Sequence, residues 1–115
     1  MTALSALAEL RDGWDGPGSK AIPTRMFASY ASLAAEFGGR IPADLEPMAG
    51  HDGGIRLEWS RPPEHFSADI EPDGGLYLCR LAESDGDDEE RQYPAFDRAV
   101  LRRFYETGRI EQEAS

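Results

Sequence analysis

Residues 53–82, GGIRLEWSRPPEHFSADIEPDGGLYLCRLA, decide the fold, because their side chains repeat with the period of two that is typical of β-strands. In IRLEW, apolar residues alternate with an arginine and a glutamate, which predicts a half-buried strand. Residues 66–71 repeat this alternation. GLYLCRLA, 75–82, is apolar on both faces, which indicates a central or covered strand.

Two connections join these strands. Pro72-Asp73-Gly74-Gly75 predicts a hairpin turn, because glycine tolerates the positive φ that such turns require. Pro62 and Pro63 separate the first two strands and argue against a tight two-residue turn there. The stretch 52–82 is therefore expected to form a three-stranded antiparallel meander.

Helical spacing appears on both sides of this sheet. Apolar residues recur at three- and four-residue intervals over 3–12, 24–37 and 94–108. Thr24 is expected to cap the second helix, and Pro94 to lie in the first turn of the third. The predicted fold is α+β: two N-terminal helices, a three-stranded antiparallel meander and a C-terminal helix, packed in two layers.

The 115 residues are expected to form a single domain, 1–115, since this length is close to the commonest domain size. Its expected parts are a helical part over 1–39, a sheet over 52–82, an acidic loop over 83–92, a C-terminal helix over 94–108 and a frayed tail over 110–115.

The composition bounds the partners and the compartment. A net charge of −10 disfavours direct binding of nucleic acid or an anionic membrane and favours a basic partner. The single cysteine excludes an intramolecular disulfide, and no signal peptide or membrane-spanning stretch is apparent. These features predict a cytoplasmic protein, and the composition is compatible with a homo-oligomer.

The segment GWDGPGSK, 13–20, has two interpretations. A tryptophan and an aspartate among glycines suit a ligand-binding loop, but they also suit a turn that ends one helix and leads into the next. We favour the structural turn, in which Trp14 fills the space between helices and sheet and Asp15 accepts backbone N–H groups. Asp52 and Asp73 each precede two glycines and a strand, so they are also predicted to be turn residues.

Few residues have the spacing of a catalytic or metal site. His51 and His65 lie next to turns or prolines and lack metal-ligand spacing, so no metal and no cofactor are predicted. Cys79 alternates with apolar residues, as a buried small side chain does. A small hydrolase-type enzyme that uses Asp15, Asp52 or Glu58 with a histidine is an alternative without a paired motif, and no catalytic residue is predicted.

Six acids fall within the eight residues 83–90. They are the candidate partner-binding residues: Glu83, Asp85, Asp87, Asp88, Glu89 and Glu90. Together with the size and charge of the chain, they predict a non-catalytic acidic module of the antitoxin, immunity-protein or phage-encoded inhibitor type that docks on a basic or nucleic-acid-binding protein. Alternatives are an assembly subunit that self-associates through its sheet and a segment that is only solvated.

Two motifs together carry a resemblance. Gly13-Trp14-Asp15-Gly16 is followed about forty residues later by Asp52-Gly53-Gly54-Ile55-Arg56-Leu57-Glu58-Trp59. This pairing resembles a group of small, uncharacterised bacterial proteins over roughly the first sixty residues. The resemblance implies a bacterial or phage origin and no particular activity.

Overall fold

The computed structural model describes residues 7–50, 52–82 and 88–110 and contains one five-stranded antiparallel sheet. The strands follow one another in space as they do in sequence: β1 (Pro47–Ala49), β2 (Ile55–Arg61), β3 (Glu64–Ile70), β4 (Leu76–Ala82) and β5 (Glu89–Tyr93). Helix α2 (Thr24–Ser32), the 3₁₀-helix η1 (Leu33–Phe37) and helix α3 (Arg98–Thr107) accompany the sheet. The fold is therefore α+β.

The predicted three-stranded meander is wrong, because a further strand pairs at each edge. β1 has three residues, begins at Pro47 and pairs with Ile55 to Leu57, so it is too short to show an alternation. β5, EERQY, replaces most of the predicted acidic loop, 83–92, within the described residues. Its sequence is charged, and only Tyr93 is buried. The strand therefore forms because it pairs with β4, and no apolar alternation in the sequence signals it.

The turn after β3 forms as predicted. The backbone N–H groups of Glu71 and Gly74 donate to Gly75 O and Glu71 O, both at 2.9 Å, and Gly74 has a φ of 98°. The connection between β2 and β3, in contrast, is only Pro62 and Pro63, whose peptide bond is cis. The expectation of a longer connection is wrong, because neither proline lies within a strand and no backbone donor is lost from the ladder.

The helices differ from the predicted ones at their ends. The second predicted helix, 24–37, is α-helical only to Ser32 and continues as η1 up to Gly38, whose φ is 74°. Its N-cap is Pro23, not Thr24. The last helix begins at Arg98 rather than at Pro94, because the Asp97 carboxylate accepts the backbone N–H groups of residues 99 and 100 and so caps the helix there.

The first predicted helix, 3–12, lies partly outside the described residues. Of its described part, only residues 7 and 8 are helical. The N–H of Leu10 donates to Leu7 O at 3.2 Å in a single turn, and the chain then enters the loop that contains GWDGPGSK. The prediction of two N-terminal helices is therefore wrong for the described residues, in which one α-helix, α2, with its 3₁₀ extension precedes the sheet.

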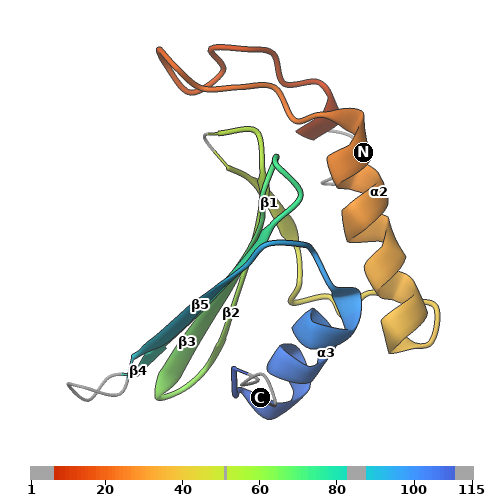
Figure 1. The fold of residues 1–115 in the computed structure, drawn as a ribbon, viewed down its shortest axis with the longest axis vertical. Helices are drawn as coiled ribbons and strands as arrows, with labels where there is room; N and C mark the ends of the chain where they lie inside the picture. Colours follow the sequence, from red (N-terminus) through yellow and green to blue (C-terminus); the bar gives the residue numbers. More distant parts are fainter. Residues whose placement is uncertain (1–6, 51, 83–87, 111–115) are drawn as a thin grey trace.

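The helices lie on one side of the sheet, and the core fills the space between them (Figure 1). Ile55, Leu57 and Trp59 of β2 are all 5% exposed or less, in keeping with the alternation of the sequence. Ile110, expected to begin the frayed tail, is only 6% exposed and joins this core. The opposite side of the sheet carries no helix of the described chain and is called the open face below.

Candidate functional site

The open face is formed by alternate residues of all five strands. These residues are Met48 on β1, Arg56, Glu58 and Ser60 on β2, His65, Ser67 and Asp69 on β3, Tyr77, Cys79 and Leu81 on β4, and Glu90 and Gln92 on β5. Met48 and Leu81, 40% and 49% exposed, are the large apolar side chains most open to solvent among the described residues. No helix of the described chain covers this face, which is the arrangement of an antiparallel sheet with one side open to solvent.

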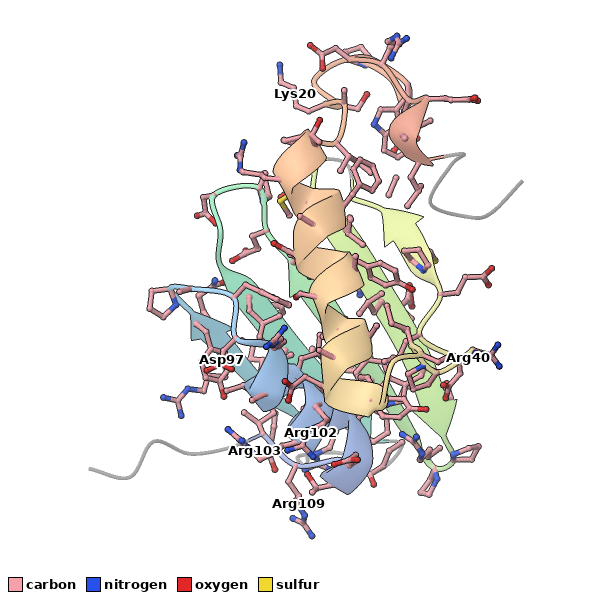
Figure 2. The ribbon with its side chains drawn as sticks, turned by 90° about the vertical axis from the view of Figure 1, so that its right-hand side faces the viewer. Lys20, Arg40, Asp97, Arg102, Arg103 and Arg109 are labelled. Carbon is pink, nitrogen blue, oxygen red and sulfur yellow. The ribbon has the colours of Figure 1, made fainter. Side chains whose placement is uncertain are left out.

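Charged side chains are distributed unequally between the two faces of the sheet. On the open face, Arg56 is the single cation among the strand residues, all of which are described, and it shares this face with three carboxylates: Glu58, Asp69 and Glu90. The other strand arginines, at positions 61, 80 and 91, share the face of the buried core residues. The helical side carries further arginines: Arg102, Arg103 and Arg109 project around α3 (Figure 2). The open face is therefore the more acidic side of the sheet.

Arg56 is the centre of the polar contacts on this face. Its Nε lies 3.4 Å from Glu58 Oε1, and its Nη1 lies 3.4 Å from Asp69 Oδ2. Both distances exceed the roughly 2.7–2.9 Å of a strong charge-assisted hydrogen bond. Partial burial raises the pKa of Asp69, and Arg56 opposes this effect, whereas Asp52, Glu71 and Glu58 add to it. One guanidinium thus only partly balances the carboxylates around it.

Tyr77 and Cys79 lie on β4 in the middle of the open face. The Tyr77 hydroxyl donates a hydrogen bond to Glu90, and this bond raises the pKa of Tyr77 to about 12. Burial, followed by the charges of Glu90 and Asp88, raises the pKa of the Cys79 thiol above its ordinary value. A thiolate is the reactive form of cysteine, so this environment does not activate Cys79 as a nucleophile.

The half-buried Cys79 is expected to react slowly with a thiol reagent. Burial raises its pKa and so disfavours the thiolate, which the reaction needs. The native protein should be labelled at least tenfold more slowly than the protein in denaturant, as followed by release of a coloured thiolate. Equal rates in the native and unfolded states would contradict this prediction and would make Cys79 a candidate nucleophile.

A cleft of about 420 Å³ opens at the end of this face near the turn between β1 and β2. Its lining is Ala49, Gly50, Asp52, Gly54, Ile55, Arg56, Asp69, Ile70, Glu71 and Tyr77. Three carboxylates and one guanidinium belong to this lining, so the cleft has an excess of negative charge. Its volume lies within the range of small-ligand pockets, about 300–1,000 Å³.

The four predicted turn residues lie in two regions. Asp52 and Asp73 each accept a backbone N–H two residues ahead, from Gly54 at 3.0 Å and from Gly75 at 2.9 Å. Asp52 also lines the cleft. Trp14 and Asp15 belong to the loop before α2, far along the chain from the open face.

The loop before α2 closes on itself through hydrogen bonds. The Trp14 indole Nε1 donates to Lys20 O at 2.8 Å, and the Asp15 N–H donates to Ser19 Oγ at 2.9 Å. Asp12, which the sequence did not single out, accepts the N–H of Ala21 at 2.9 Å. Trp14 is half-buried and lies outside the buried core, so it does not fill the space between helices and sheet.

The candidate partner-binding acids have different surroundings. Glu83, Asp85 and Asp87 lie outside the described residues. Asp88 Oδ1 accepts the N–H of Ala82 at 2.9 Å, and Glu89 Oε1 lies 2.6 Å from Arg80 Nη2 on the helical side. Glu90 alone of the described acids in this segment faces outward on the open face. Sequence reasoning missed Asp69, Glu71 and Tyr77, although their period-two positions could have placed Asp69 and Tyr77 on one face.

Among the described residues, one histidine contacts a side-chain hydroxyl, the kind of pair that a nucleophile and its base would form. His65 Nδ1 lies 2.8 Å from Ser60 Oγ, and both residues are at the opposite end of the open face from the cleft. His51 lies outside the described residues. Within 7–50, 52–82 and 88–110, no three His, Cys, Asp or Glu side chains are placed to hold a metal ion.

No family model, curated protein or solved structure matches this chain. The resemblance carried by residues 13–16 and 52–59 therefore stays a prediction. Among the described helices, none has the length and apolarity needed to cross a bilayer. The geometry of the open face is accordingly the basis for the function proposed below.

Proposed function

We propose that this protein is a non-catalytic acidic binding module that docks through its open face on a basic or nucleic-acid-binding protein. Antitoxins, immunity proteins and phage-encoded inhibitors are the classes of module to which it would belong. The observation that carries the proposal is the separation of charge across the sheet, with Glu58, Asp69 and Glu90 on the open face and most strand arginines on the other. A reducing cytoplasm suits the half-buried free thiol of Cys79.

The net charge of −10 supports the same proposal. An acidic surface attracts a basic partner over several ångströms and speeds their encounter, whereas it repels the phosphates of free nucleic acid. The exposed Met48 and Leu81 add apolar contact area at two corners of the face.

Assembly through the sheet edges receives less support from the structure. The β1 edge has three residues and includes Pro47, and the β5 edge carries Glu89, Glu90 and Arg91. Short strands, proline and charged side chains are features that discourage edge-to-edge pairing. A partner on the open face is therefore favoured over a second copy on an edge.

The proposed docking face can be tested with a lysine-only dodecapeptide and a double variant, Glu58→Gln with Glu90→Gln. The variant should bind this peptide about fivefold more weakly at low salt, mainly through slower association, and the difference should shrink at 0.5 M salt. Stopped-flow fluorescence at two ionic strengths measures both rates.

The matched control is Asp44→Asn with Glu106→Gln, which removes the same charge from the helical side, where Asp44 accepts from the Tyr105 hydroxyl at 2.5 Å. This control should keep at least half of the wild-type affinity. Equal loss in both double variants would mean that total charge alone matters, and the proposed face would be wrong. A separate variant, Asp85→Asn with Asp87→Asn, tests the acidic segment in the same peptide-binding measurement.

A further inference from the structure

The cleft at one end of the open face differs from the rest of that face in shape and in chemistry. Asp69 and Tyr77 are paired neighbours on β3 and β4, and Asp52 and Glu71 approach from the turns that flank β2 and β3. Gly50 and Gly54 bring no side chain to the lining, and Asp52 Oδ1, which accepts the N–H of Gly54, lies beside them. The result is an acidic hollow with an aromatic ring at one side.

The arrangement of the carboxylates favours a large planar cation over a metal ion. A metal ion requires several oxygen atoms within about 2.0–2.6 Å of one point, and the described residues provide no group of three ligating side chains that close together. A guanidinium presents five N–H donors around a plane, so it can bond to carboxylates on different sides of a hollow.

The existing contacts leave capacity for such a ligand. Arg56 reaches Asp69 only at 3.4 Å, and the side chain of Asp69 is 28% exposed. The Tyr77 hydroxyl donates to Glu90 on β5, which restrains the phenol ring, and Tyr77 belongs to the cleft lining. A ring restrained in this way can stack on a guanidinium, while the methylene stem of the ligand lies along the backbone of Gly50 and Gly54.

We propose that this cleft receives a single arginine side chain of the basic partner, with Asp69 and Asp52 bonding to its guanidinium and Tyr77 stacking on it. The inference rests on the proposed function, for which it names the anchoring residue of the partner. It accounts for the gathering of Asp52, Asp69 and Glu71 around one hollow. Lysine fits less well, because its ammonium is a point charge that reaches fewer of the separated carboxylates.

The test uses three small probes: the N-acetyl methylamides of arginine, lysine and citrulline. Citrulline has the shape of arginine without its charge. In ¹H–¹⁵N spectra of the full chain, the arginine probe should shift the amides of Gly50, Gly54 and Tyr77 saturably, with a Kd in the millimolar range typical of a fragment. The lysine probe should bind several-fold more weakly, and citrulline should cause no saturable shift.

Two variants locate the binding. Asp69→Asn should weaken the arginine probe at least fivefold, whereas Glu106→Gln, on α3, removes the same charge and should leave its Kd unchanged. Equal shifts with arginine and citrulline, or equal weakening in both variants, would overturn the inference. The Glu58 and Glu90 changes could weaken binding of the lysine dodecapeptide while no arginine-specific shift is seen. That result would support the proposed docking face and overturn the arginine site in the cleft. Arginine binding in the cleft, together with equal peptide binding by the wild type and the Glu58 and Glu90 double variant, would support the cleft and overturn the proposed docking face.

Discussion

Replacing Trp59 with alanine is expected to unfold most of the protein at temperatures where the wild type is folded. Trp59 is 5% exposed and stacks on Phe66 at 5.6 Å between ring centroids, and Phe104 and Tyr105 of α3 each lie at 5.5 Å. Removal of a buried aromatic side chain costs about 3–5 kcal/mol. For a domain of this size, that lowers Tm by roughly 15–25 °C, which calorimetry or circular dichroism would measure.

Trp14→Ala is the matched control for this prediction. Trp14 is the second tryptophan of the chain, but it is half-buried and its indole bonds within its own loop. Its replacement should cost about 1–2 kcal/mol, the range of a lost hydrogen bond with partial packing. If the two variants lost equal stability, the assignment of Trp59 to the core and of Trp14 to a peripheral loop would be contradicted.

Trp59→Phe separates the ring contacts of Trp59 from its N–H group. The indole Nε1 of Trp59 is buried without a hydrogen-bond partner, and an unsatisfied buried donor costs about 1–3 kcal/mol. Phenylalanine removes that donor and keeps an aromatic ring, so this variant should lose less than about 1.5 kcal/mol. A loss as large as that of the alanine variant would show that the indole N–H is bonded in solution.

The second large effect is expected at Arg80, whose side chain is 11% exposed. Its guanidinium joins Glu64 of β3 to Glu89 of β5, with Nη2 at 2.6 Å from Glu89 Oε1, and these hydrogen bonds raise the pKa of Arg80. Arg80→Ala would leave two carboxylates without their cation on the helical side of the sheet. Because both carboxylates are more than one third exposed, we expect a loss of about 2–3 kcal/mol, less than for a fully buried pair.

Chemical denaturation would measure this loss, and hydrogen exchange would locate it at β5. Replacing all three residues, Arg80→Met with Glu64→Gln and Glu89→Gln, should recover most of the stability, since no unpaired charge then remains. Arg56→Ala is the matched control: its side chain is 44% exposed and its contacts are 3.4 Å long, so it should lose under about 1 kcal/mol. A larger loss at Arg56 than at Arg80 would contradict the assignment of the central ion pairs.

The sequence predicts the central part of the sheet well because its strands bury one face. Ile55, Leu57 and Trp59 alternate as their burial requires, and the glycines at 74, 38 and 108 adopt the positive φ that ends a strand or helix. The edge strands lack this signal. β5 is polar and is held by pairing and by Arg80, and β1 is too short for any pattern to be seen.

The sequence predicts the candidate site less well, for a related reason. Period-two spacing places Asp69 on one face of β3, but it does not show which strand lies beside it. The neighbours Tyr77 and Arg56 come from strands on either side of Asp69, and their registers became known only with the structure. The sequence favours a core position for Trp14 because tryptophan is highly buried on average, whereas its loop forms its own hydrogen bonds.

The strictly sequential order of the five strands has a consequence for synthesis on the ribosome. Each strand pairs only with the strands next to it along the chain, so every hairpin can close as soon as its second half emerges. Helix α3 is delivered last among these elements, and it supplies Phe104, which packs against Trp59 and Phe66. A nascent chain halted before residue 98 would therefore expose the aromatic side of its sheet, and we expect chaperones to bind that intermediate rather than the finished protein.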